Sequence, residues 1–312
     1  MIQLGNYNTL KILRHTDPGI YLEGDEQTGD ILLPQRYVTP QMHDGDMLEV
    51  FIYLDQDERI VATTEHPLAK VGEFAFLQVA WINQYGAFLH WGLMKDLFCP
   101  FREQKQRMQR GKSYIVFIKE DEASHRLMAT AKVEKYLSVP YAATPSQQSE
   151  QPAEQPAEQP IPLLKHGQAC DCLIWQKTDL GFKAIVCAPE ADSDPTSPTP
   201  YYQAQLYDNQ IFQPLHTGDR LTAYVDHVRQ DGKIDITLQP TGRRQTLDFA
   251  EVLLRYLYEN GGRCNLGDNS PAELISDRFH VSKKAFKRAV GDLYRRRLIV
   301  ITDDGIQLAN VK

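Results

Sequence analysis

The feature that most constrains the fold of this chain is a short segment that occurs three times. The copies are LKILRHTDPGIYL at 10–22, LQVAWINQYGAFL at 77–89 and CLIWQKTDLGFKA at 172–184. They align without a gap when Gly19, Gly86 and Gly181 are superimposed. Each copy alternates apolar and polar residues, passes through a polar turn that contains the glycine, and alternates again. A period of two predicts strands rather than helices, so each copy is predicted to form a strand, a turn and a strand.

Each copy is followed by a similar ending, in which a glycine and a charged residue precede a strand, a charged turn and a last strand. These endings begin at Asp44, Arg110 and Thr217. We therefore expect three small all-β domains, at 1–66, 67–138 and 163–242. Five short strands of this kind favour a closed OB-fold barrel, because closure removes exposed strand edges.

Residues 139–162 are predicted to link the second and third barrels. The stretch TPSQQSEQPAEQPAEQPIP, at 144–162, repeats Glu-Gln-Pro and contains almost no large apolar side chain. Such a segment cannot bury enough apolar surface to offset its ordering entropy, so we expect an extended, flexible chain.

Residues 243–312 change to a helical pattern. TLDFAEVLLRYLYENGG spaces its apolar residues by three and four and ends in two glycines, which predicts an amphipathic helix. Ser270 and Ser282 are the predicted N-caps of two further helices, and LIVITDDGIQLAN predicts a hairpin. Three helices followed by a hairpin are typical of a winged helix, an α+β domain. The expected architecture is a mostly β, multidomain chain.

The second repeat contains a familiar motif. GEFAFLQVAWINQYGAFLHWGLMKDLFCPF, followed by KEDEASHRLMATAK, resembles the S-one motif, an RNA-binding barrel of the OB-fold class. Three such barrels before a winged helix that contains SKKAFKRAVGDLYRRRLI resemble the bacterial virulence-factor-B family. This resemblance covers nearly the whole chain, and the domain order and SKKAFKRA are its most specific parts. It implies that the protein binds RNA.

The resemblance also implies which residues of the second barrel contact RNA. In the motif, these are a ring before the glycine, a ring two positions after it, and an Asp/Arg pair near the last turn. Here those positions hold Tyr85, Phe88, Asp121 and Arg126. A histidine of the motif is replaced by Cys99, so that contact is not carried over.

The other two barrels keep less of this motif. The first has Pro18 and Ile20-Tyr21 where the rings belong, so we expect both rings to be missing from its turn. The third has Leu180 and Lys183, and its Phe182 is predicted to lie on the other face of the strand. The aromatic platform is therefore expected in the second barrel only.

Local charge separates the barrels independently of any resemblance. The chain has a net charge of −7, yet residues 67–138 hold eleven basic and seven acidic residues, and 243–312 hold thirteen and nine. The basic residues of the second barrel cluster in FREQKQRMQRGK, which includes Arg102, Lys105 and Arg107. Because phosphate binding depends on local charge, these two domains are the candidates for nucleic-acid binding. The first barrel, with four basic and twelve acidic residues, is expected to be structural or to bind a protein partner.

Two interpretations of Tyr85 and Phe88 are open. Either the rings pack at the end of the barrel beside a solvated basic face, or they stack on bases. Strand alternation places Ala87 and Leu89 inward and Phe88 outward. The barrel pattern, the neighbouring basic cluster and the absence of both features from the sister barrels favour stacking, which is how OB-folds hold single strands.

The third helix of the winged helix is predicted to be basic on the face opposite its apolar residues. The outward residues are Lys283, Lys284, Lys287 and Arg288. Lysine is a flexible point charge, so this face is expected to contact phosphates rather than to read bases. The leading interpretation is an RNA-binding regulatory protein that holds single strands by stacking and phosphate contacts. The alternative is a winged-helix DNA-binding transcription regulator whose barrels bind partners.

No motif in the sequence indicates an enzyme, a cofactor or a metal site. The five cysteines are scattered, and Cys170 and Cys172 are expected to be structural, reduced thiols rather than zinc ligands. The chain has no apolar run long enough for a membrane helix and no apolar leader at its N-terminus. We therefore expect a cytoplasmic bacterial protein.

Overall fold

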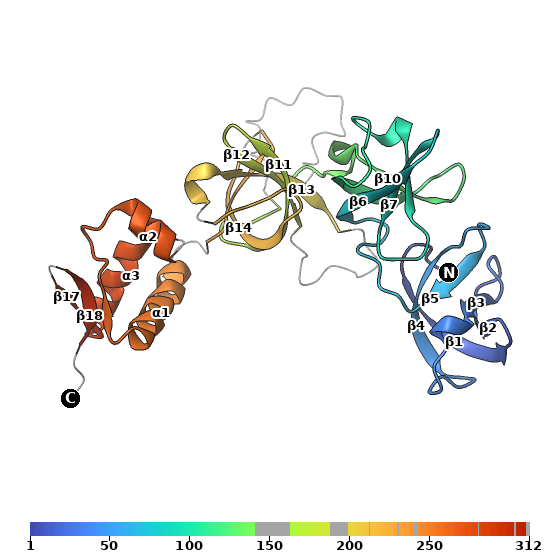
Figure 1. The fold of residues 1–312 in the computed structure, drawn as a ribbon, viewed down its shortest axis with the longest axis horizontal. Helices are drawn as coiled ribbons and strands as arrows, with labels where there is room; N and C mark the ends of the chain where they lie inside the picture. Colours follow the sequence, from blue (N-terminus) through green and yellow to red (C-terminus); the bar gives the residue numbers. More distant parts are fainter. Residues whose placement is uncertain are drawn as a thin grey trace, which may run out of the picture. The chain divides into compact units, whose positions relative to one another are not determined.

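The protein was analysed as a computed structural model (Figure 1). The structure describes residues 1–140, 163–187, 199–211, 213–229, 231–239, 243–279, 281–302 and 304–309. Residues 141–162 of the predicted linker lie outside this described part. The chain divides into two compact units, Met1–Tyr136 and Leu137–Lys312.

The first unit contains two closed five-stranded barrels, as the repeats predict. The first barrel consists of β1 (Tyr7–Thr16), β2 (Gly19–Leu22), β3 (Ile31–Pro34), β4 (Met47–Leu54) and β5 (Ile60–Thr63). The second consists of β6 (Phe74–Ile82), β7 (Gly86–His90), β8 (Leu97–Pro100), β9 (Ser113–Glu120) and β10 (Leu127–Thr130). In each barrel the third and fifth strands pair in parallel and all other neighbouring strands are antiparallel.

The second unit begins with a third closed barrel of the same topology. Its strands are β11 (Ala169–Thr178), β12 (Gly181–Cys187), β13 (Tyr201–Tyr207), β14 (Arg220–Val228) and β15 (Ile234–Thr237). A core of its own fills this barrel, and Cys170 and Cys172 both point into it. The structure therefore places both thiols on one face of β11, where they pack as small apolar side chains.

A β-bulge interrupts the first strand of every barrel at the same place. The register shifts after Ile12 in β1, after Val79 in β6 and after Ile174 in β11. In each case the backbone carbonyl of that residue accepts a hydrogen bond from the N–H of a glycine in the turn that precedes the fourth strand. The donors are Gly45, Gly111 and Gly218, at 2.8, 2.9 and 2.8 Å. The repeated glycine beside a charged residue thus holds the bulge in place.

The three superimposed glycines of the turns are required because the backbone of the third strand passes too close for a side chain. A Cβ at Gly19, Gly86 or Gly181 would lie 2.1–2.4 Å from the carbonyl oxygen of Leu33, Cys99 or Leu206, respectively. Gly19 and Gly181 also have φ values of +146° and +134°, which L side chains rarely adopt. In all three barrels, the absence of a side chain at the turn glycine therefore allows the third strand to pass close to the turn.

The first two barrels share a hydrophobic core. Phe51 of β4 packs edge-on against Trp91, which follows β7, with ring centroids 5.9 Å apart, and Tyr7 of β1 packs edge-on against Phe51 at 5.3 Å. Phe51 and Trp91 belong to a buried cluster that includes Leu77 and Leu89 of the second barrel, and Tyr7 packs against this cluster. The backbone N–H of Leu68, in the connection between the barrels, donates to the carbonyl of Trp91 at 2.7 Å. The two barrels therefore form one packed body.

The C-terminal part of the second unit has the predicted winged-helix elements. They are α1 (Arg243–Glu259), β16 (Arg263–Cys264), α2 (Ala272–Phe279), α3 (Lys283–Arg295), β17 (Ile299–Thr302) and β18 (Gly305–Leu308). The sheet order is β16-β18-β17, so the predicted hairpin gains a short third strand that the sequence pattern did not reveal. Ser282 caps α3 as predicted, because its Oγ accepts the N–H of Ala285 at 3.2 Å. No helix in the described residues is long and apolar enough to cross a membrane.

The shared core predicts that the first barrel stabilises the second. In a Trp175→Phe background, the remaining tryptophans are Trp81 and Trp91, both of the second barrel, and Trp91 lies at its contact with Phe51. Phe51→Ala removes a fully buried ring from the first barrel, at a cost of about 3–5 kcal/mol. We expect the tryptophan-monitored urea transition to move to lower urea.

Ile20→Ala serves as the reference, because Ile20 is buried in the first barrel's separate core. A similar shift in both variants means that the two barrels unfold as one cooperative unit. If the transition does not move in Phe51→Ala, the two barrels unfold independently.

Candidate nucleic-acid interface

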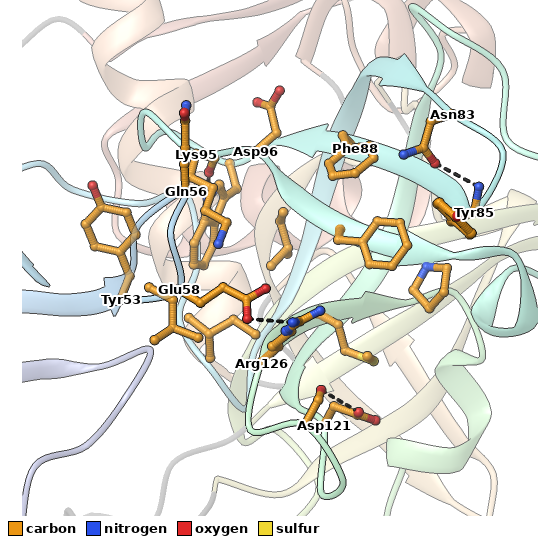
Figure 2. Close-up of a pocket in the computed structure, with 18 of the residues that line it drawn as sticks. Tyr53, Gln56, Glu58, Asn83, Tyr85, Phe88, Lys95, Asp96, Asp121 and Arg126 are labelled. Atoms are coloured by element: carbon orange, nitrogen blue, oxygen red, sulfur yellow. Dashed lines mark hydrogen bonds and ion pairs between the residues drawn. The ribbon is translucent and has the colours of Figure 1, made fainter. Parts of the chain in front are cut away.

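A groove on the first unit brings exposed aromatic rings together with basic side chains (Figure 2). Its cavity volume is about 980 Å³. Most of the wall comes from the second barrel, and the turn after β4 of the first barrel completes it. The aromatic residues that line it are Tyr53, Trp81, Tyr85, Phe88, Trp91, Phe98 and Phe101.

Trp81 and Phe88 form the centre of this platform. Their rings are nearly parallel, at an interplanar angle of 4° and a centroid distance of 3.7 Å. Phe98 of β8 lies next to Phe88 at 4.9 Å. The indole Nε1 of Trp81 donates to Asp96 Oδ2 at 3.0 Å, which fixes the ring's orientation. The indole is 44% exposed, so the stack presents an ordered aromatic surface to solvent.

Tyr85 extends the platform from the turn between β6 and β7. Its ring is 66% exposed. The side chain of Asn83 accepts the backbone N–H groups of Tyr85 and Gly86 at 2.8 and 3.1 Å, and the N–H of Phe101 donates to the carbonyl of Tyr85 at 3.0 Å. These bonds fix the backbone of Tyr85 on both sides, so the exposed ring projects from a rigid turn (Figure 2).

The predicted orientation of β7 is confirmed. Ala87 and Leu89 are fully buried, and Phe88 faces the groove. Trp81, however, was not among the predicted site residues. Strict alternation from the buried Leu77 and Val79 would turn Trp81 inward, and the bulge after Val79 turns it outward, opposite Phe88.

A signal for this reversal exists in the sister repeats. The positions that align with Trp81 are Arg14 and Gln176, which are polar residues where alternation predicts apolar ones. Both are exposed in the structure. Polar residues in two of three copies would have indicated that this position faces outward in every barrel.

The strand β8 contributes Phe98 to the site. Cys99, which holds the histidine position of the motif, is fully buried, whereas its neighbour Phe98 pairs with Phe88 across the sheet. Burial raises the pKa of the Cys99 thiol to about 12, so the side chain stays neutral and apolar. The residue that faces the groove from this strand is therefore an aromatic ring.

The predicted charged residues divide into two groups. Arg102, Asp121 and Arg126 line the groove. A hydrogen bond from Ser124 Oγ, at 2.7 Å, is the main reason why the pKa of Asp121 is lowered, and the charge of Arg102 adds to it. Asp121 is therefore an ionised carboxylate that orders the turn between β9 and β10.

Lys105 and Arg107 do not line the groove. Lys105 forms an ion pair with Glu134. The guanidinium of Arg107 lies over the ring of Phe101 at 3.6 Å, so Arg107 supports the platform from outside. The basic cluster of the sequence is thus contiguous along the chain but divided in space.

The sister barrels carry different side chains at the positions of Trp81 and Phe88. In the first barrel Arg14 pairs with Tyr21, and its guanidinium covers that ring at 4.5 Å while it binds Asp30 at 2.7 Å. The expectation that the first barrel lacks both rings was therefore wrong for Tyr21. In the third barrel the pair is Gln176 and Lys183, and Phe182 is buried as predicted.

The winged helix presents the predicted basic face on α3. Phe286, Ala289, Val290 and Leu293 are buried against the domain core. Lys284, Lys287 and Arg288 are exposed, and Lys283 is half-buried. Lys287 lies 4.0 Å from Asp268. The face is therefore solvent-accessible, with one of its cations near a carboxylate.

No group of three or more His, Cys, Asp or Glu side chains in the described part of the chain is arranged to hold a metal ion. Burial raises the pKa of the Cys170 thiol to about 12, and it also raises the pKa of Cys172.

Comparisons with known proteins match both ends of the chain to domain families. Residues 4–65 match the S1 domain, and residues 251–308 match the CvfB-like winged helix domain. Both are nucleic-acid-binding domain types. A solved multidomain protein with nucleic acid binding domains from Streptococcus pneumoniae TIGR4 is 20% identical, covers 98% of each chain and has a TM-score of 0.39.

Relatives of similar length match most of the chain. The uncharacterized protein YitL of Bacillus subtilis is 27% identical over 299 residues, which are 93% of this chain and 89% of YitL. Conserved virulence factor B of Staphylococcus aureus is 23% identical over 281 residues, which are 86% of this chain and 83% of the relative. The chain thus combines S1-type barrels with a CvfB-like winged helix domain, and it is homologous to proteins named conserved virulence factor B.

Proposed function

We propose that the protein binds single-stranded RNA in the groove of the first unit. The observation that carries this proposal is the ordered stack of Trp81 and Phe88 beside the exposed ring of Tyr85. A packing role would bury these rings, whereas here the platform is fixed by hydrogen bonds and still faces solvent. Arg102 and Arg126 stand beside the rings, within reach of a backbone that follows stacked bases.

The chemistry of the groove favours unpaired bases over duplexes. Every base has a flat face, so stacking on aromatic rings contributes about 1–3 kcal/mol per base and tolerates many sequences. Bases in a duplex are already stacked and paired, and their faces are not available to a protein. A site built on rings therefore suits single strands, loops and ends of RNA.

The winged helix is proposed to add phosphate contacts through the basic face of α3. Lysines dominate this face, and lysine neutralises phosphate without the bidentate geometry that reads a base edge. In this proposal the protein acts by binding RNA, in a regulatory role, rather than by catalysis. The alternative, a DNA-binding regulator, requires α3 to read base edges in a major groove.

The platform is tested by removing its rings. Trp81→Ala combined with Tyr85→Ala removes two stacking surfaces, so we expect affinity for an unstructured oligouridylate or oligoadenylate to fall well over tenfold. Tyr85→Ala with Phe88→Ala is expected to act similarly, because Phe88 supports the indole of Trp81. Fluorescence anisotropy at one fixed salt concentration measures the change.

Phe76→Ala is the matched control. Phe76 lies on the same strand as Trp81 and is 38% exposed, but it does not line the groove. Circular dichroism and urea unfolding establish that each variant is folded. If the folded ring variants bind as tightly as the parent, the groove is not the RNA site.

The role of α3 is tested by its salt dependence. Replacing Lys283, Lys284, Lys287 and Arg288 with glutamine should weaken RNA and DNA binding alike. The slope of log affinity against log salt should become shallower by about 0.7–0.9 for each phosphate that the variant no longer neutralises. Titrations at several salt concentrations against several sequences measure both effects.

The matched control neutralises four cations of the third barrel, Lys165, Lys177, Lys183 and Lys233. An unchanged slope in the α3 variant, or the same change in the control, contradicts phosphate binding by α3. A weakening confined to one duplex DNA sequence would favour the DNA-binding alternative, because it would show that α3 reads bases.

A further inference from the structure

The turn between β4 and β5 of the first barrel forms one wall of the groove. Gln56 and Glu58 of this turn line the same cavity as the rings of Trp81 and Phe88. Glu58 Oε2 lies 2.5 Å from Nη2 of Arg126, across the junction of the two barrels (Figure 2). The first barrel therefore contributes an amide and a carboxylate to the candidate site, although its sequence and charge did not predict nucleic-acid binding.

This wall is anchored without the carboxylate of Glu58. Lys95 of the second barrel donates from Nζ to the carbonyl oxygen of Asp55 at 2.6 Å. The pKa of this ammonium is lowered, because the effect of burial exceeds the opposite effect of the nearby charges of Glu58 and Asp55. Within the turn, Arg59 binds the carboxylate of Asp55 at 2.7 Å. Removal of the Glu58 carboxylate therefore leaves the turn attached to the second barrel.

The cavity is lined by three cations and three carboxylates, so it does not attract phosphate by net charge. The cations are Lys95, Arg102 and Arg126, and the carboxylates are Glu58, Asp96 and Asp121. Asp96 has one carboxylate oxygen near Trp81 and the other near His90. Asp121 has one oxygen near Ser124 and the other near Arg102.

Glu58 differs from the other two carboxylates of the groove. Its Oε2 is bound by Arg126, and its Oε1 has no hydrogen-bond or ion-pair partner among the described residues. The side chain is 46% exposed, so a ligand in the groove can reach this oxygen. An ionised carboxylate only accepts hydrogen bonds and repels phosphate, so the ligand group that meets Oε1 must be a donor.

A single strand offers two kinds of donor, base N–H groups and the ribose 2′-OH. Base donors differ from one nucleotide to the next, whereas stacking on Trp81, Tyr85 and Phe88 tolerates any base. The 2′-OH is present at every nucleotide of RNA and at none of DNA, and a protein that contacts it distinguishes the two. The donor that fits a sequence-tolerant platform is therefore the 2′-OH.

We propose that Glu58 is the residue by which this groove selects RNA over single-stranded DNA, through a hydrogen bond from a ribose 2′-OH to its Oε1. The inference rests on the proposed binding of single strands to the groove. Arg126 holds Oε2 and so directs Oε1 toward the ligand. The first barrel thereby supplies the sugar contact, and the second supplies the stacking surface.

The test compares three ligands of one length: oligouridylate, its 2′-O-methyl form and oligodeoxyuridylate. The parent protein should bind oligouridylate about tenfold more tightly than the other two, the factor expected for a hydrogen bond to a charged acceptor. Glu58→Ala removes the acceptor, so the ratio between the ligands should fall to about one. Glu58→Gln has a single amide oxygen, which Arg126 binds, so its NH2 group faces the ligand and the ratio should also fall to about one.

Loss of the negative charge strengthens binding of all three ligands alike, so only their ratio reports on the 2′-OH. Glu49→Gln is the matched control, because it removes the same charge from an exposed position of β4 outside the groove. It should leave the ratio unchanged. The proposal is overturned if the parent binds the three ligands equally, if Glu58→Ala keeps the parent's ratio, or if the ratio follows base identity when oligoadenylates replace oligouridylates.

The ring variants separate this proposal from the one on which it rests. If the groove binds single strands, Trp81→Ala with Tyr85→Ala weakens binding of all three ligands, whatever their ratio. If the ring variants weaken binding and Glu58→Ala keeps the parent's ratio, only the proposed role of Glu58 is rejected, and the groove is retained as the site. If the ring variants bind like the parent, the groove itself is rejected as the site.

Discussion

The site depends on a β-bulge that a glycine N–H holds in the first strand of each barrel. Without the bulge, Trp81 would continue the inward series of Leu77 and Val79 and enter a core that Leu89 and Ala87 already fill. With it, the indole lies flat against Phe88 on the outer face. The same hydrogen bond extends the pairing of the first and fourth strands that closes the barrel, because it ties the first strand to the turn before the fourth. Folding and exposure of the platform thus share one local constraint.

Periodicity made much of the fold predictable. The three barrels, the order of the domains, the outward direction of Phe88 and the buried side of α3 all follow from repeats of two or of three and four residues. Trp81 was missed because a bulge breaks the period. Phe98 was not predicted because the sequence motif does not reveal the strand register, which pairs Phe98 with Phe88. Lys105 and Arg107 are close to Arg102 in sequence but lie outside the groove, because they follow the short 3-10 helix Phe101–Glu103, whose first two residues line it.

The contribution of the first barrel could not be read from the sequence, because it arises from the packing of two domains. Phe51 and Trp91 fix the barrels against each other, and this contact brings the turn with Glu58 to the edge of the groove. Charge counted along the chain assigns Glu58 to a domain that repels phosphate. Charge counted around the cavity assigns it to a site lined by three cations and three carboxylates.

The common register of the three barrels has a consequence for how such a chain changes over time. The outward pair is Arg14 with Tyr21, Trp81 with Phe88 and Gln176 with Lys183, on the same bulge and the same turn glycine. None of these pairs enters a barrel interior. The same strand positions can therefore hold a ring covered by arginine, as in the first barrel, an exposed aromatic stack, as in the second, or a polar pair, as in the third. Two substitutions at this outward pair would therefore change the surface chemistry of a barrel without repacking its core.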